Sequence, residues 1–137
     1  MRRIDYEKNL VLNTSRNSRI AYLFSGIVCT VIGIYINIPA ITSNYFSESY
    51  ILLAIGIGQI MLAYVAPHIF PNDERSEKIV GRAMYINYFV LFIMLFVLYS
   101  LISSDIWILS GVQLLIIIFS VMVISIPATM IIYTKKY

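Results

Sequence analysis

The sequence predicts an all-α integral membrane protein with four transmembrane helices arranged as two helical hairpins. Hydrophobic residues make up 60% of its 137 residues and charged residues only 12%, whereas soluble domains average about 45–50% apolar and about 25% charged residues. The apolar residues also fall into four long runs, and about 20 such residues are enough to cross a membrane. A single polar stretch, residues 67–83, divides these runs into two pairs.

The chain opens with a polar arm, residues 1–19, that contains five of its ten Lys and Arg residues. The apolar run after Arg19 is longer than the about 7–15 residues of a signal peptide, and no Ala-x-Ala cleavage site follows it. We therefore expect an uncleaved first span over residues 20–41. Within the arm, the apolar residues form only a weak helical stripe that could lie on the membrane surface.

Residues 20–66 are predicted to form the first transmembrane hairpin. Pro39 and residues 42–49 would connect its two spans, and the second span would run from about Tyr50 to Ala66. Small side chains recur every four residues along the first span, a pattern that lets another helix approach closely. We expect this face to pack against the second span rather than to form a homodimer. The predicted packing residues on the two spans are Ala21, Ser25, Cys29, Gly33, Ala54 and Gly58.

The third helix is predicted to begin in the cytoplasmic loop, residues 67–83, and to continue into the membrane as far as Ile102. Asn72 or Asp73 is a suitable N-cap after Pro71, because an Asn or Asp side chain accepts hydrogen bonds from the free amides of the first turn. Glu74 and Lys78 are four residues apart, in the order that favours an ion pair on a helix.

The second hairpin is predicted over residues 84–133, followed by a cytoplasmic C-terminus at residues 134–137. A tight turn at residues 103–105 would precede Trp107, an interfacial anchor. The fourth span would begin at Ile106, with a kink near Pro127 because proline removes a backbone hydrogen bond.

The distribution of positive charge predicts the orientation. All ten Lys and Arg residues lie in the N-terminal arm, the central loop and the C-terminus, and neither outer connection has any. The positive-inside rule then predicts that both termini and the central loop are cytoplasmic. The Ile-, Asn- and Tyr-rich composition indicates a bacterium with AT-rich DNA, and hence the bacterial inner membrane.

Four amide side chains lie within the predicted spans: Asn37, Gln59, Asn87 and Gln113. No Asp, Glu, Lys or Arg lies deep in a span, which argues against an ion-coupled carrier or a proton relay. We expect the amides to form hydrogen bonds between helices. The alternative is that several copies of the chain assemble a pore lined by them.

No pattern in the sequence predicts catalysis or a cofactor. The single histidine, His68, and the single cysteine lack partners for a metal site, and no glycine-rich phosphate loop is present. The basic residues do not line one face, as nucleic-acid binding would require. We therefore expect no enzyme, no metal, no cofactor and no nucleic-acid partner. The predicted contact surface is a charged cytoplasmic face composed of Asp73, Glu74, Arg75, Lys78 and Arg82.

The Asp73-Glu74-Arg75 motif, followed by an apolar helix containing Ile79 and Ala83, resembles a pattern in uncharacterised small four-span bacterial membrane proteins. This resemblance covers about a dozen residues and implies no particular activity. Our first functional hypothesis is an accessory protein that contacts a membrane partner, as a transporter subunit, a regulator or an immunity-type protein. The alternative is a small channel or transporter formed by homo-oligomerisation.

Overall fold

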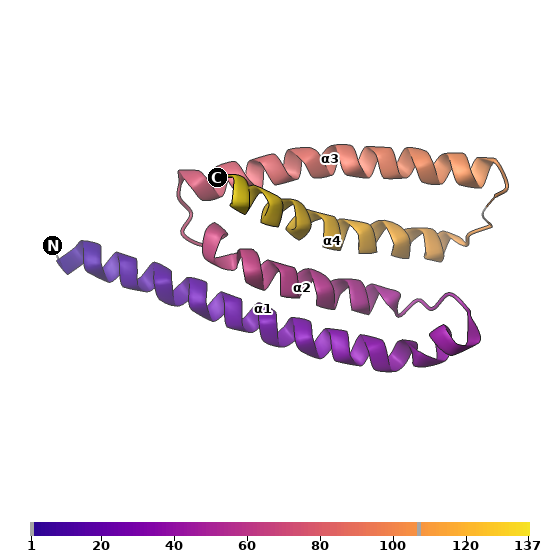
Figure 1. Ribbon diagram of the computed structural model, residues 1–137, viewed down its shortest axis with the longest axis horizontal. Coiled ribbons are helices and arrows are strands. Elements are labelled where there is room, and N and C mark those ends of the chain that lie inside the picture. The colour runs from indigo at the N-terminus through magenta and orange to yellow at the C-terminus, as the bar shows by residue number, and fades with distance from the viewer. Residues whose placement is uncertain (1, 107) are drawn as a thin grey trace.

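A computed structural model describes residues 2–106 and 108–137, including all their side chains except those of residues 2–6 and 8. This part of the chain contains no strand and four helices: α1 (Arg2–Ser43), α2 (Tyr50–Ile69), α3 (Glu74–Ser103) and α4 (Gly111–Lys136) (Figure 1). Each helix is long and apolar enough to cross a membrane. The predicted all-α fold with four candidate spans is confirmed, and these helices indicate a multi-pass membrane protein.

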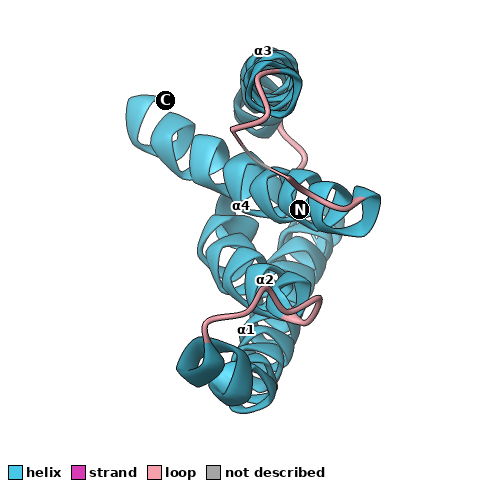
Figure 2. Ribbon diagram, turned by 90° about the vertical axis from the view of Figure 1, so that its right-hand side faces the viewer, coloured by secondary structure: helices cyan, strands magenta, loops and turns pink. Residues whose placement is uncertain are grey.

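The four helices form an open row in the order α1, α2, α4, α3 (Figures 1 and 2). Helix α2 packs against α1 on one side and against α4 on the other, and α4 packs against α3. Within the described residues, α1 contacts neither α3 nor α4. The two predicted hairpins are therefore joined mainly through α2 and α4, with a smaller contact between α2 and α3, and they do not close into a four-helix bundle.

Helix α1 is a single helix that includes the N-terminal arm. The arm continues directly into the first apolar run, and α1 extends beyond the ends of the other helices (Figure 1). The arm residues of α1, 2–19, correspond to roughly 27 Å of helix at about 1.5 Å per residue. At its other end α1 passes through Pro39, which we expected in the connection, and stops before Asn44, whose φ of 55° is left-handed.

Helix α4 begins at Gly111, later than the predicted start at Ile106. Ser110 and Gln113 form a capping box. The Ser110 hydroxyl accepts a hydrogen bond from the backbone amide of Gln113 at 3.2 Å, and the backbone amide of Ser110 donates one to Gln113 Oε1 at 3.0 Å. The connection before it is longer than the expected tight turn, because residues 104–106 and 108–110 all lie outside the helices. The predicted anchor Trp107 lies outside the described residues.

Helix α3 begins as the sequence predicts, with Asp73 as its N-cap. The Asp73 carboxylate accepts a hydrogen bond from the Ser76 amide at 2.8 Å, which satisfies one of the free donors of the first turn.

The prolines near the ends of α2 and α4, Pro67 and Pro127, both lie inside their helices. Position 67 is therefore in the last turn of α2 rather than beyond its end.

The buried core lies where α2, α3 and α4 converge, near the start of α3. Val65 of α2, Ile79 and Ala83 of α3 and Met130 of α4 form one cluster, and each has 5% or less of its surface exposed. Elsewhere, large apolar side chains of α1 and α3 are widely exposed, as expected of helices that face lipid. The molecule is thus most tightly packed at the end where α3 begins.

Candidate functional site

The contact between α1 and α2 uses a different face of α1 from the predicted one. Of the expected residues Ala21, Ser25, Cys29 and Gly33, only Gly33 is buried, and Ala21 is exposed. The close contacts involve two glycines: a Cβ atom on Gly26 would lie 3.0 Å from the Gly56 carbonyl oxygen, and one on Gly33 would lie 3.1 Å from the Leu53 amide nitrogen.

The geometry of the helix explains this difference. Consecutive residues are about 100° apart around the axis, so each four-residue step rotates the side chain by about 40° and the predicted stripe turns away from the partner. Alternating steps of four and three residues cancel this rotation and stay on one face. The observed face follows such steps: Gly26, Thr30, Gly33, Asn37 and Ala40, of which all but the half-buried Thr30 are buried.

Helix α2 carries one glycine for each of its two main neighbours. A Cβ atom on Gly56 would lie 2.7 Å from the amide nitrogen of Thr30 in α1, and one on Gly58 would lie 2.8 Å from the carbonyl oxygen of Val123 in α4. The prediction that Gly58 packs against the first helix is therefore wrong, because residues two apart point to nearly opposite sides of a helix. The other predicted residue, Ala54, is buried.

Of the four amide residues, Asn87 alone makes a side-chain hydrogen bond between helices, donating from Nδ2 to Thr129 Oγ1 at 2.6 Å. Asn37 is fully buried and donates to the Gly33 carbonyl of its own helix at 2.7 Å. Gln113 caps α4, and the Oε1 atom of Gln59 is buried with no hydrogen-bond partner among the described residues. Asn37 and Gln113 belong to α1 and α4, which do not touch within the described residues.

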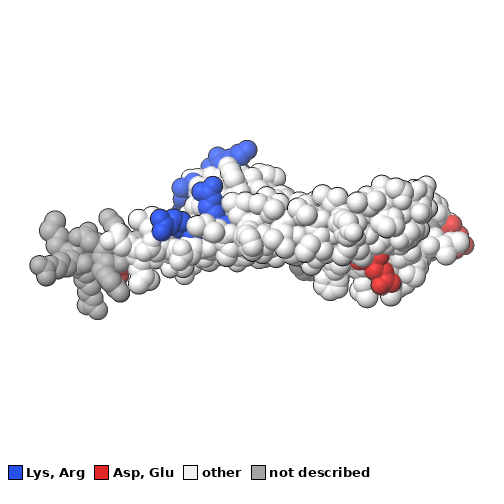
Figure 3. All heavy atoms as spheres, turned by 90° about the horizontal axis from the view of Figure 1, so that it is seen from below, with Lys and Arg blue, Asp and Glu red and all other residues white. Residues whose placement is uncertain are grey.

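Positive charge gathers at one end of the molecule, which we call the basic end (Figure 3). The arm of α1, the start of α3 and the end of α4 all lie there. Arg75 links two of these segments, because its Nη2 atom donates to the Thr134 carbonyl at 3.4 Å. A cation is favourable at this position because the last carbonyls of a helix carry partial negative charge.

The structure divides the predicted charged face into two parts. Asp73 caps α3 and Arg75 binds the end of α4, so both side chains serve the fold. Lys78 and Arg82 point away from the core, and together with Gly81 and Tyr85 they line an open cavity of about 420 Å³. Among the described side chains, no Lys or Arg nitrogen lies within 4.0 Å of a carboxylate oxygen, so the expected ion pair with Glu74 is not formed.

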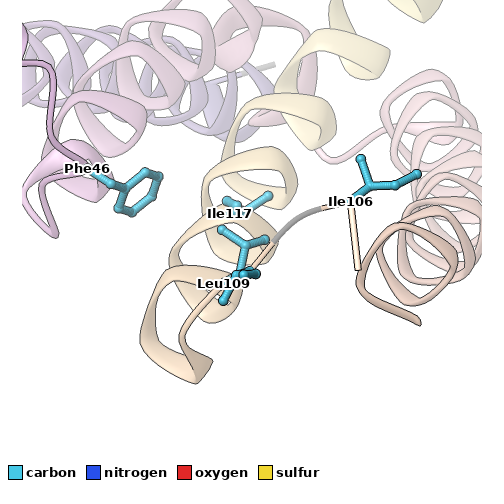
Figure 4. A pocket seen from close by; sticks show the side chains of 5 residues that line it. Phe46, Ile106, Leu109 and Ile117 are labelled. Atoms are coloured by element: carbon cyan, nitrogen blue, oxygen red, sulfur yellow. The ribbon is translucent and has the colours of Figure 1, made fainter. Parts of the chain in front are cut away.

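An apolar pocket of about 310 Å³ lies at the end opposite the basic end (Figure 4). Phe46, from the connection between α1 and α2, faces Leu109 and Ile117 of the α4 region, and Ile106 lies on the other side. The sequence does not predict this pocket, because the apolar residues from 106 onwards read as part of the fourth helix. The capping box at Ser110 is the local signal that these apolar residues precede the fourth helix.

Within the described residues, no group of three His, Cys, Asp or Glu side chains is placed to hold a metal ion. The features that the described residues do provide are an open cavity beside two basic residues, an apolar pocket and long uncovered helix faces, all of which suit binding. No family model, no curated protein and no solved structure matches the chain.

Proposed function

We propose that this chain is an accessory protein of the bacterial inner membrane, with both termini cytoplasmic, that acts through contacts with a membrane-protein partner. The observation that carries this proposal is the open row of helices. Helix α1 sits at one edge and packs only against α2 within the described residues. Helices in a membrane associate through van der Waals packing, so an edge helix has room for a second neighbour. Phe24 and Tyr35, for example, are 72% and 76% exposed.

The N-terminal arm supports the same proposal. At the end of α2, the ring centroids of Tyr22 and Phe70 lie 6.4 Å apart. The arm extends beyond the end of α2 (Figure 1). A helix without neighbours is only marginally stable in water. A partner that covered both the arm and the membrane part of α1 would stabilise the whole helix and would link a cytoplasmic event to the bilayer. A transporter subunit, a regulator and an immunity-type protein all fit this description.

The positions of the amides favour this proposal over a pore made of several copies. A pore requires polar side chains along a common path. Asn37 is buried in the α1–α2 contact and Gln113 is engaged in the cap of α4. Both side chains thus make hydrogen bonds within one chain, while Asn37 Oδ1 and Gln59 Oε1 are buried without a partner among the described residues.

Site-specific photo-crosslinking in native membranes tests the proposal. A photoreactive residue is placed at Leu12 in the arm or at Tyr35, which are 67% and 76% exposed, and at Phe96 of α3, which is 66% exposed, as the matched control. We expect one defined protein adduct from the two α1 positions and none from Phe96. Adducts with lipid alone, or with a second copy of this chain alone, would overturn the proposal.

A further inference from the structure

Gly81 differs from the four glycines at the helix contacts and resembles only Gly111, the first residue of α4, in having open space around it. Gly26, Gly33, Gly56 and Gly58 all face a neighbouring helix so closely that an added Cβ atom would meet other atoms within about 3.0 Å. A Cβ atom on Gly81 would meet nothing within 4 Å. Glycine destabilises a helix interior relative to alanine, and no contact among the described residues accounts for it here. The missing side chain leaves a gap on the outer surface of α3.

Two of the residues around this gap carry positive charge, and Lys78 also lines a neighbouring cavity with Asp73 and Glu74. Lys78 and Arg82 lie one helical turn apart on the same face, and they share the cavity with Gly81 and Tyr85. No described carboxylate oxygen lies within 4.0 Å of either cation. The wall of the cavity is almost wholly apolar, so Lys78, Arg82 and Tyr85 line it mainly with their carbon atoms and a ligand would meet the two charged groups beyond this wall.

The surface next to the cavity changes abruptly from charged to aromatic. Along the same face of α3, Tyr88, Phe89 and Phe92 are 67%, 45% and 65% exposed. A ligand that followed this face would meet positive charge first and then a continuous apolar surface. An anionic phospholipid has this combination of a charged headgroup and apolar chains.

We propose that Lys78, Gly81, Arg82 and Tyr85 bind the phosphate group of an anionic phospholipid. Lys and Arg form strong charge-assisted hydrogen bonds with phosphate oxygens, and basic pockets beside transmembrane helices bind anionic headgroups. The hydroxyl of Tyr85 donates a further hydrogen bond, and the gap at Gly81 lets the headgroup approach the helix. The acyl chains then lie on Phe89 and Phe92.

The charges also argue against a second copy of the chain on this surface. A symmetric contact through the outer face of α3 would bring Lys78 and Arg82 close to the same two residues of the other copy. Like charges repel each other, and more strongly where water is excluded. The lipid site requires no protein partner, so it stands or falls independently of the proposed accessory function.

Native mass spectrometry of the full-length protein in detergent tests the proposal, with phosphatidylglycerol, phosphatidylcholine or soluble glycerol 3-phosphate added. We expect wild-type protein to retain phosphatidylglycerol in preference to phosphatidylcholine, and to retain no glycerol 3-phosphate, which lacks the acyl chains. The double substitution Lys78→Gln with Arg82→Gln should lower retention of phosphatidylglycerol by at least about tenfold, because two charge-assisted contacts are lost. Retention of glycerol 3-phosphate equal to that of the lipid would overturn the assignment to lipid.

Two further variants separate a specific site from general electrostatic attraction. Lys135→Gln with Lys136→Gln removes the same amount of charge elsewhere at the basic end and should leave lipid retention unchanged. Gly81→Leu keeps every charge and adds a side chain at an exposed position where a Cβ atom meets nothing within 4 Å, so it should fold and lose the lipid preference. Equal losses from the two double variants, or full retention in Gly81→Leu, would contradict the proposal. So would a protein found on this face in place of lipid.

Discussion

Gly58 of α2 lies against the carbonyl group of Val123 in α4, where a Cβ atom on the glycine would be 2.8 Å from the carbonyl oxygen. Pro127 stands four residues after Val123 and has no amide hydrogen, so this carbonyl lacks its usual donor within the helix. The glycine of one helix and the proline of the other thus act on the same peptide group. This contact joins the two hairpins.

Gly58→Ala should therefore weaken the contact between α2 and α4. The new methyl group would meet both Val123 Cγ1 and the Val123 carbonyl, and overpacking of this kind costs about 1–3 kcal/mol. Unfolding of the protein in mixed micelles measures the change in its free energy of unfolding. The control Gly81→Ala should stabilise the protein by up to about 1 kcal/mol, because that position has open space. Equal effects of the two substitutions would show that Gly58 is not at a close contact.

Combining Gly58→Ala with Val123→Ala gives a second test of the same geometry. The valine substitution removes Cγ1 from the clash and leaves the carbonyl oxygen where it is, so we expect partial and not full recovery of stability. Full recovery would mean that the side chain alone, and not the α4 backbone, limits how closely the helices approach.

The hydrogen bond from Asn87 to Thr129 is expected to couple α3 and α4. In a double-mutant cycle of Asn87→Leu and Thr129→Val, the coupling free energy should be about 0.6 kcal/mol and at most about 1.7 kcal/mol, the range measured between membrane helices. Asn87→Leu alone should lower the free energy of unfolding only modestly, because the substitution also removes Oδ1, which is buried without a partner among the described residues. A coupling free energy of zero would mean that the two side chains act independently.

The parts of the fold that could be predicted depend on local signals. Four apolar runs indicate four helices, and Asp73 after Pro71 marks the start of α3. Two differences between the prediction and the structure also have local signals in the sequence. Residues 2–25 contain neither proline nor glycine, which allows the arm to continue into α1. The Ser110–Gln113 capping box marks the true start of α4, whereas hydrophobicity alone extends the helix to Ile106.

The choice of helix neighbours could not be predicted in the same way. Small residues lie on several faces of α1 and α2, and each face is compatible with a close contact. The preference of Gly58 for α4 depends on the backbone around Pro127, which is far away in the sequence. For the same reason the predicted charged face divides in the structure, because Arg75 finds the carbonyl of Thr134 only once α4 is in place.

Ser110→Ala should destabilise the first turn of α4. The substitution removes the hydroxyl that accepts a hydrogen bond from the backbone amide of Gln113. Loss of an N-cap lowers the free energy of unfolding by about 1 kcal/mol. Hydrogen exchange of the amides of residues 111–114 should become faster. Ser100→Ala is the matched control, since this exposed serine bonds to the Phe96 carbonyl inside α3 and caps no helix. Unchanged exchange in Ser110→Ala would indicate that packing, and not the cap, fixes the start of α4.

Thiol labelling tests the predicted orientation. The background is Cys29→Ala, which leaves no other thiol, and single cysteines are introduced by Ser15→Cys in the arm or Ser103→Cys at the end of α3. Because the positive-inside rule predicts a cytoplasmic basic end, a membrane-impermeant maleimide should label Ser103→Cys in intact cells, and Ser15→Cys only after permeabilisation. The reverse pattern would invert the protein and would place Lys78 and Arg82 on the outer side. Labelling of both positions in intact cells would mean that the chain between them crosses the membrane an even number of times, which contradicts three spans there.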